Sequence, residues 1–369
     1  MPTNTAAWMP AKKARFQVGP APYTPPADDE IVVANRAVAV NPVDWITQDL
    51  GYLIFSYIHY PWVLGSDLAG EVVEVGSAVT RFAVGDRVLG HAVGFDKHRN
   101  RAAEGAFQDH TVVLERMASP IPDSLTYEQA CVVPLALSTA ACGLFQADQL
   151  GLAHPSSVPV PTGKTVVIWG GSTSVGSNAV QLAVAAGYDV VTTASPANAA
   201  YVTKLGAGDV VDYRSPTAVD DVVAALKGRT IAGAMAIGSG SAQACSDVVA
   251  ASAGTRFVSM VTPPASLDNV PSGVVGLLGT FSRFGAATVS LAARNRVRRI
   301  RTGSVFGTTL VDNEVCRMVY QDFLPQALAS GHFVAAPPPL VVGRGLEHLQ
   351  SALDRQKDGV SAQKVVVSL

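Results

Sequence analysis

Cysteine is scarce in this chain of 369 residues, which contains only Cys131, Cys142, Cys245 and Cys316. Even the two nearest, Cys131 and Cys142, are too far apart in sequence to form a C-x-x-C zinc or redox motif. A disulfide framework is not expected in a chain of this length either, so we expect a reducing compartment.

Charge is also scarce and almost balanced. Charged residues make up 15% of the chain, against about 25% in an average protein. Lys and Arg number 27 and Asp and Glu number 29, which gives a formal net charge of −2. Because phosphate neutralisation needs a basic surface, we expect no nucleic-acid binding. The 48% apolar residues can bury large cores and exclude a disordered chain.

The sequence has no uninterrupted apolar run long enough for a membrane span. Its longest apolar stretch, residues 273–293, contains Arg283 and several Gly and Ser, and a charge inside hydrocarbon is costly. Lys12, Lys13 and Arg15 are not followed by an apolar run, so no signal peptide is predicted. We therefore expect a soluble, cytoplasmic protein with no membrane partner.

The length suggests about two domains, and the sequence pattern changes along the chain in a way that agrees. The first 120 residues predict short strands and turns of a small antiparallel barrel. A Pro- and Ser-rich connector, residues 155–161, precedes alternating strands and helices, which predict a parallel sheet. Residues 262–310 have no clear pattern. The predicted division is residues 1–160 with 305–369 in one domain and residues 161–304 in the other.

A glycine-rich turn is the strongest local motif. The apolar strand Val166–Trp169 is followed by Gly170-Gly171-Ser172-Thr173-Ser174-Val175-Gly176 and then by a predicted helix. Such a turn lets backbone N–H groups face a pyrophosphate at the positive end of a helix. The spacing is not G-x-G-x-x-G, so both a dinucleotide site and an ordinary strand–turn–helix connection are consistent with it.

The end of the next strand bears on which cofactor would bind. In folds that prefer NAD, an acidic residue at this position binds the ribose 2′-OH. Here the strand Val190–Thr193 is followed by Ala194-Ser195-Pro196-Ala197-Asn198, which contains no acid. Ser195 and Asn198 can donate hydrogen bonds to a 2′-phosphate, which favours NADPH, although a plain polar loop is the alternative.

Several further motifs resemble the medium-chain dehydrogenase/reductases. They include Asn41-Pro42-Val43-Asp44-Trp45, Leu64-Gly65-Ser66-Asp67-Leu68-Ala69-Gly70, Val84-Gly85-Asp86-Arg87-Val88 and Gly359-Val360-Ser361-Ala362-Gln363-Lys364. The resemblance covers nearly the whole chain and is strongest to the zinc-independent, fungal trans-acting enoyl reductases of polyketide biosynthesis. It implies an α/β fold in which a Rossmann-type parallel-sheet domain accompanies a GroES-like, β-barrel-type domain, with the active site in the cleft between them.

The resemblance also implies site residues. Thr139 is the expected catalytic contact, within an apolar substrate-facing segment of Leu137, Ser138, Thr139, Ala140 and Leu144. The positions that would hold NADPH are Val43, Asp44, Ser172, Thr173, Ser174, Val175, Ser195, Asn198, Tyr213, Met260, Val360 and Ser361.

No metal is expected. Zinc-dependent members carry a Gly-His-Glu motif and a cysteine-rich lobe, whereas this chain has Gly65-Ser66-Asp67 and only four cysteines. A catalytic zinc needs three protein ligands and an open position, and the histidines of the first domain are scattered along the sequence.

Two departures from the family pattern keep other functions open. Ile46 stands after Trp45 where the family usually has a lysine, and the segment Ala234–Gly238 lacks an acid often found there. The predicted function is NADPH-dependent reduction of an activated C=C bond in secondary metabolism. The alternatives are a quinone or alkenal reductase, a zinc alcohol dehydrogenase, which the missing ligands oppose, and an NADPH-binding protein with a non-redox role.

One segment near residue 300 is rich in arginine. Residues 294–301 contain five arginines, which could meet an acidic acyl carrier protein or polyketide synthase, or could form a solvated edge. The expected substrate is accordingly a small molecule or a carrier-bound acyl chain.

Overall fold

The computed structural model describes residues 3–265 and 274–369, so Gly273 at the start of the longest apolar stretch lies outside the described residues. The chain forms two compact units. Unit 1 comprises Met1–Ser138 and Val311–Leu369, and unit 2 comprises Thr139–Leu310. The combination of α-helices with one parallel sheet and two sheets that are antiparallel or mainly so agrees with the predicted fold class.

The boundary between the units falls inside a helix, α3 (Pro134–Phe145), and not at the Pro-rich connector where the sequence placed it. Side-chain contacts explain this difference. The Ser259 hydroxyl on strand β13 (Phe257–Met260) shares its one proton between the Gly143 carbonyl at 2.9 Å and Gln149 Oε1 at 3.0 Å. These contacts hold residues that follow Ser138 to the sheet of unit 2, and the Val305 N–H donates to the Met260 carbonyl of the same sheet at 2.9 Å. Residues 139–160 and 305–310 accordingly belong to unit 2.

Unit 1 is built on a seven-stranded sheet of order β15-β16-β3-β5-β6-β8, in which β7 also pairs with β3. A second sheet has the order β2-β1-β4. The strands are β1 (Asn4–Met9), β2 (Gln17–Ala21), β3 (Glu30–Ala39), β4 (Trp62–Val63), β5 (Asp67–Val75), β6 (Arg87–His91), β7 (His110–Leu114), β8 (Ala118–Pro120), β15 (Pro339–Arg344) and β16 (Lys364–Ser368). All their pairings are antiparallel except β15 with β16.

The helical elements of unit 1 include one that the sequence analysis missed. Helix α1 (Pro42–Ile54) lies among strands, where only strands and turns were expected. The others are η1 (Ala102–Glu104), η2 (Glu115–Met117), α2 (Tyr127–Ala130), the start of α3, α9 (Glu314–Arg317), the π-helix η3 (Met318–Phe323), α10 (Leu324–Ser330), η4 (Leu346–His348) and α11 (Leu349–Lys357).

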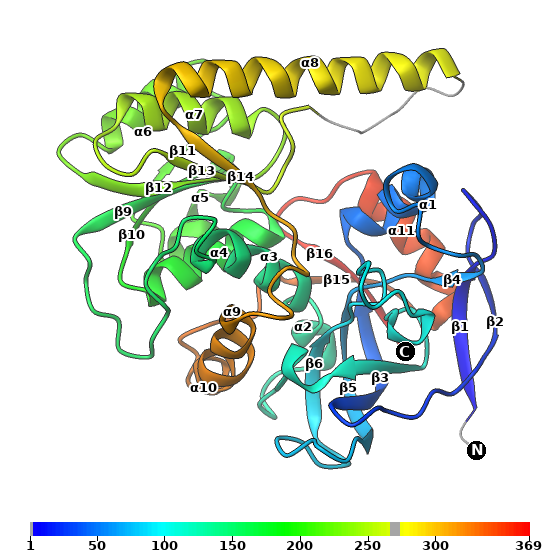
Figure 1. The fold of residues 1–369 in the computed structure, drawn as a ribbon. Coiled ribbons are helices and arrows are strands. Elements are labelled where there is room, and N and C mark those ends of the chain that lie inside the picture. The colour runs from blue at the N-terminus through cyan, green and yellow to red at the C-terminus, as the bar shows by residue number, and fades with distance from the viewer. Residues whose placement is uncertain (1–2, 266–273) are drawn as a thin grey trace. The chain divides into compact units, whose positions relative to one another are not determined.

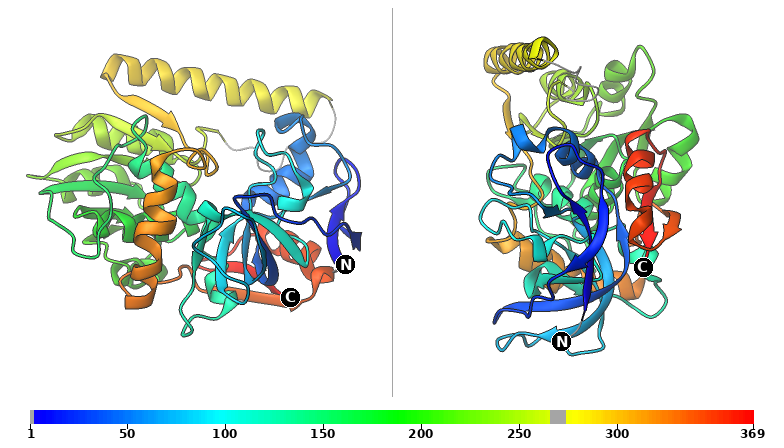
Figure 2. Two further views of the ribbon diagram at one scale, coloured as in Figure 1. Left: turned by 60° about the horizontal axis from the view of Figure 1, so that its bottom comes forward. Right: turned by 90° about the vertical axis from the view of Figure 1, so that its right-hand side faces the viewer.

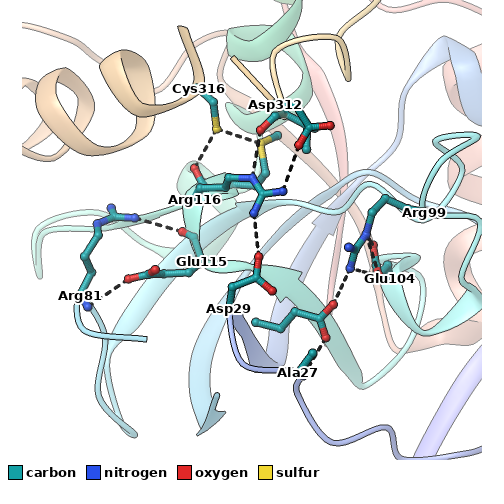
Figure 3. Close-up of polar contacts among 12 residues, drawn as sticks. Ala27, Asp29, Arg81, Arg99, Glu104, Glu115, Arg116, Asp312 and Cys316 are labelled. Carbon is teal, nitrogen blue, oxygen red and sulfur yellow. Dashed lines mark hydrogen bonds and ion pairs between the residues drawn. The ribbon is translucent and has the colours of Figure 1, made fainter. Parts of the chain in front are cut away.

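Ion pairs tie distant segments of unit 1 together (Figure 3). Arg116 pairs with Asp29 at 2.8 Å and with Asp312 at 3.2 Å, which connects the N-terminal strands to the C-terminal part of the unit. Arg99 and Arg101 each pair with the carboxylates of Glu30 and Glu104, both of which are buried. Buried charges are tolerated only when they are paired in this way.

Unit 2 is a six-stranded, entirely parallel sheet of order β11-β10-β9-β12-β13-β14. Its strands are β9 (Lys164–Trp169), β10 (Asp189–Thr193), β11 (Asp209–Val211), β12 (Thr230–Ala236), β13 (Phe257–Met260) and β14 (Arg301–Ser304). The intervening helices are α4 (Ser174–Ala185), α5 (Pro196–Lys204), α6 (Ala218–Ala225), α7 (Ser241–Ala251) and α8 (Val274–Arg298). This alternation confirms the predicted parallel sheet.

The order of the strands reverses between β9 and β12. The chain runs outward from β9 through β10 to β11, and then returns to β12 and runs outward through β13 to β14. In open parallel sheets, ligands bind at the carboxyl ends of the strands beside such a switch point. The glycine-rich turn follows β9 and therefore lies at this position.

Helix α8 is the main element of the region that the sequence left unassigned, and it forms one long helix in Figures 1 and 2 (yellow). Its C-terminal part is held by Asn295, whose side chain donates to the Ser246 hydroxyl of α7 at 3.1 Å. Leu278, Phe281 and Val289 are exposed on this helix.

One apolar helical stretch, Tyr127–Phe145, has the length and hydropathy of a membrane span. Within the protein, 83% of its most apolar 18-residue segment is buried, as is usual for a core helix. The soluble state and the cytoplasmic location stay predictions.

Candidate functional site

The glycine-rich turn of unit 2 is shaped by a close backbone contact. Gly170 has a φ of +90°, which strongly favours glycine, and a Cβ at Gly176 would lie 2.1 Å from the Gly170 carbonyl oxygen. Thr173 caps helix α4, since its hydroxyl donates to the Gly170 carbonyl and accepts from the Gly176 N–H at 3.0 Å. The turn leads directly into a twelve-residue helix, and glycine at 170 and 176 leaves no side chain at these two positions.

The four predicted pyrophosphate contacts all lie in this turn or in the first residues of the helix. Ser172, Ser174 and Val175 are half-buried, and Thr173 is exposed. The turn engages both polar groups of Thr173, since its hydroxyl and its backbone N–H, at 3.1 Å, each donate to the Gly170 carbonyl. The amino terminus of a helix attracts anions through its unpaired N–H groups and its dipole.

The carboxyl ends of β10 and β11 lie side by side, joined by a 3.0 Å bond from the Ala194 N–H to the Val211 carbonyl. This arrangement brings Ser195, the residue before α5, and Asn198, in the first turn of α5, to the same sheet edge as Tyr213. No acidic residue occurs between Thr193 and Asn198. The structure therefore assembles the predicted adenosine side of the site at one edge of the sheet.

Arg214 is a candidate residue at this edge that the sequence analysis missed. Its guanidinium lies over the Tyr213 ring, 5.4 Å from the ring centroid, and its Nε donates to the Tyr213 hydroxyl at 3.3 Å. Both side chains are exposed. An arginine near the ribose accommodates a 2′-phosphate in folds of this kind, and its position directly after Tyr213 was the signal available in the sequence.

Met260 ends β13 at the same edge of the sheet and is half-buried. The catalytic candidate Thr139 lies in α3 and is 8% exposed, while Ala140 and Leu144 in the same helix are fully buried. Leu137 and Ser138, which belong to unit 1, are fully buried as well. The roles of these α3 residues toward a substrate stay predictions.

In unit 1, Val43 and Asp44 lie in the first turn of α1, and Val360 and Ser361 lie between α11 and β16. The Asp44 carboxylate is buried and accepts hydrogen bonds from the backbone N–H groups of Asn41, at 2.7 Å, and of Gly65. Burial raises the pKa of Asp44 to about 7. Its side chain therefore serves the start of α1, while a direct contact with a cofactor stays a prediction.

A buried hydrogen-bond chain runs from β6 to η3 inside unit 1. His91 Nδ1 lies 2.8 Å from Ser138 Oγ, and Ser138 Oγ lies 2.7 Å from the Tyr320 hydroxyl. The Tyr320 hydroxyl donates to the Pro134 carbonyl at 2.9 Å, which can only accept. Ser138 must then donate to Tyr320, and His91 Nδ1 must donate to Ser138.

This direction fixes the tautomer of His91. A neutral imidazole that donates from Nδ1 carries a lone pair on Nε2, and His91 Nε2 has no hydrogen-bond partner in the described part of the chain. Burial lowers the pKa of His91 to about 4, so the ring is neutral at physiological pH.

The comparisons with known proteins agree with this architecture. Residues 27–123 match the family described as "Alcohol dehydrogenase GroES-like domain". The chain is 52% identical over 371 residues to "Dehydrogenase pigH" of Monascus ruber, covering all of both chains. It is 40% identical to "Trans-enoyl reductase himH" of Aspergillus japonicus, covering 99% of this chain and 97% of the relative.

Among solved structures, an alcohol dehydrogenase superfamily protein from Novosphingobium aromaticivorans has the same fold. Its TM-score is 0.72 at 24% identity, and all of each chain is covered.

Zinc, which some proteins of this fold bind, does not fit the residues present. Across residues 3–265 and 274–369, no three His, Cys, Asp or Glu side chains are grouped so that they could hold a metal ion. At the position of the zinc motif, Ser66 offers only a hydroxyl, and the Asp67 carboxylate is already bound by Lys364, Asn41 and the Leu135 N–H.

The buried imidazole of His91 predicts a specific dependence of stability on pH. The pKa of His91 in the folded protein lies below its unfolded value of about 6.5. The ring's contribution to the free energy of unfolding is therefore complete above pH 6.5 and is lost as the pH falls toward 4. Between pH 7 and pH 5 this one group should cost the wild type about 2 kcal/mol of unfolding free energy.

For His91→Gln, the fall in unfolding free energy from pH 7 to pH 5 should be about 2 kcal/mol smaller than for the wild type. Urea unfolding at both pH values measures this difference. Asp44 titrates in both proteins, so its opposite contribution cancels in the comparison. The exposed His59→Gln serves as the control and should follow the wild type. Identical pH dependence in His91→Gln and wild type would contradict the assignment.

Proposed function

The chain belongs to the medium-chain dehydrogenase/reductase family, and from this premise we propose that it is an NADPH-dependent reductase of an activated C=C bond. The observation that carries the proposal is the carboxyl edge of the parallel sheet in unit 2. There a glycine-lined helix start and the acid-free end of β10 lie beside Tyr213 and Arg214.

Each part of this edge fits one part of the cofactor. The N–H groups of Ser172, Ser174 and Val175 would hold the pyrophosphate at the amino end of α4, in a turn that Thr173 fixes. Ser195, Asn198, Tyr213 and Arg214 would surround the 2′-phosphate, and Arg214 supplies a positive charge. Met260 in unit 2, and Val43, Val360 and Ser361 in unit 1, are the proposed contacts of the nicotinamide end. A bound nicotinamide supplies the hydride that reduces the C=C bond.

The chain's own part in the reaction is orientation of the substrate. The apolar segment from Leu137 to Leu144 suits a hydrophobic acyl or polyketide chain, and the Thr139 hydroxyl is the proposed polar contact for its carbonyl oxygen. The Asp44 carboxylate is committed to two backbone N–H groups and His91 is neutral. The proton that completes the reduction at the α-carbon is therefore proposed to come from solvent.

An acyl group on an acidic carrier protein or a polyketide synthase is the proposed form of the substrate. Arg294 and Arg298 both form ion pairs with Asp247. The Arg294 pair has a distance of 3.8 Å, and the Arg298 pair is closer. Arg296 and Arg299 are exposed and pair with no carboxylate among the described residues. These two arginines supply the positive charge that an acidic partner would need.

The first prediction concerns cofactor choice. NADPH should bind at least about tenfold more tightly than NADH in calorimetric titration, a difference of about 1.4 kcal/mol. Arg214→Gln should reduce the ratio of the two affinities, because it should weaken the binding of NADPH and not that of NADH. Arg229→Gln is the matched control, because Arg229 pairs with Asp209 at the opposite end of β11, and should leave the ratio unchanged. Equal affinities for both cofactors in the wild type would refute the proposal.

The second prediction concerns the reaction. Wild-type protein should oxidise NADPH with enoyl thioesters or enones, and Thr139→Trp should abolish turnover because the reacting atoms must be held at about 3–3.5 Å. NADPH affinity should stay near the wild-type value, since the phosphate contacts lie elsewhere in unit 2. Thr139→Val, which is nearly the same size, should fold normally and lower turnover through loss of the hydroxyl.

The same assay separates the alternatives. Activity confined to quinones or simple alkenals would replace the enoyl substrate. NADPH binding without oxidation across enones, enoyl thioesters and quinones would overturn the reductase proposal and favour the non-redox role that Ile46 keeps open.

A further inference from the structure

A fully buried ion pair lies inside unit 1, where α1, β5 and β16 begin. The Lys364 ammonium lies 2.9 Å from Asp67 Oδ2, and the two side chains are only 4% and 0% exposed. Lys364 also donates to the side-chain oxygen of Asn41, whose amide nitrogen in turn donates to Asp67 Oδ2 at 2.8 Å. The other Asp67 oxygen accepts from the Leu135 N–H at 2.6 Å.

Burying two charges costs free energy. A protein with hydrophobic residues of similar volume in place of a buried ion pair is often equally stable or more stable. The pair therefore calls for a reason beyond stability. The ammonium joins the first residue of β5 to the residue that precedes α1, and both oxygens of the Asp67 carboxylate accept hydrogen bonds in this network.

The contacts of Asn41 extend the network to the start of α1. The Asn41 N–H donates to Asp44 Oδ2, and the Asp44 carboxylate also accepts from the Gly65 N–H. Val43 lies between Asn41 and Asp44 in this turn, so its backbone position depends on both. The positive charge of Lys364 also acts on Asp44, where it partly offsets the rise in pKa caused by burial.

We propose that the Lys364 ammonium is the resident cation of unit 1, holding Asp67 and Asn41 as a bound metal would, and that it is a positioning residue for the Asn41–Asp44 turn. The ammonium occupies the carboxylate at the very motif where zinc-dependent members carry ligands. Its catalytic consequence rests on the proposed function, through Val43, whereas its role as the cation does not.

The test compares Lys364→Met and Lys364→Ala with the surface control Lys357→Met, which removes an exposed pair with Asp49. Lys364→Met leaves Asp67 charged and buried, and should lower Tm by roughly 10 °C, whereas the control should hardly change it. The double variant Lys364→Met/Asp67→Asn should regain much of the loss.

Chemical rescue gives a readout that simple loss of packing would not. Lys364→Ala leaves a space that matches n-propylammonium, so this cation should restore Tm and turnover, while tetramethylammonium, with the same charge but the wrong shape, should not. If the proposed function holds, Lys364→Met should lower kcat about 100-fold with NADPH affinity preserved, because a small displacement at a reacting centre has an effect of that order.

Zinc analysis completes the experiment. Wild-type protein equilibrated with zinc should retain none at this position. One zinc per chain that Asp67→Asn abolishes, wild-type Tm in Lys364→Met, or failure of n-propylammonium to restore Tm would each overturn the proposal. If the wild type reduces no C=C bond, the proposed function fails, while the Tm, rescue and zinc results still decide the role of Lys364.

Discussion

The contact between Gly176 and the Gly170 carbonyl determines where unit 2 can receive a dinucleotide. A Cβ at Gly176 would lie 2.1 Å from that oxygen, so the turn after β9 can close tightly only with glycine. The tight turn delivers the amino end of α4 to the switch point of the sheet, and the amino end of a helix attracts anions. Every proposed cofactor contact in unit 2 lies along the sheet edge that this turn defines.

Unit 1 depends on a different constraint, the pairing of buried charge. Glu30 and Glu104 are matched by Arg99 and Arg101, and Asp67 is matched by Lys364. Through Asn41, the last of these pairs reaches the start of α1, where one proposed contact of the nicotinamide lies. Unit 2 thus offers backbone N–H groups to a ligand, and unit 1 uses its buried polar groups to fix one turn.

The sequence predicted the parallel sheet of unit 2 well because each of its elements is local. Strand β9 contains the continuous apolar run Val166–Trp169, and α4 begins at a threonine cap two residues after Gly171. Helix α1 was missed because a pair such as Asn41-Pro42 is also a common turn signal. Proline at the first helical position with an acid at the third is also a helix-start signal, and Asp44 confirms that interpretation.

Other features of the site could not be derived from local patterns. The bond between Asn41 and Lys364 joins residues that are 323 positions apart in the sequence, and nothing near either residue indicates the partner. The donor direction in the series of hydrogen bonds from His91 to Pro134 also depends on tertiary contacts. The boundary of unit 2 lay earlier than the Pro-rich connector suggested because Ser259 binds residues after α3 begins.

The most direct test of the central claim follows the hydride itself. Wild-type protein would be supplied with NADPH carrying deuterium at C4 of the nicotinamide, on either face, and with an α,β-unsaturated thioester in ordinary water. We expect a saturated product with one deuterium, located at the β-carbon, from one of the two labelled faces only. A product without deuterium, or deuterium at the carbonyl carbon, would contradict it.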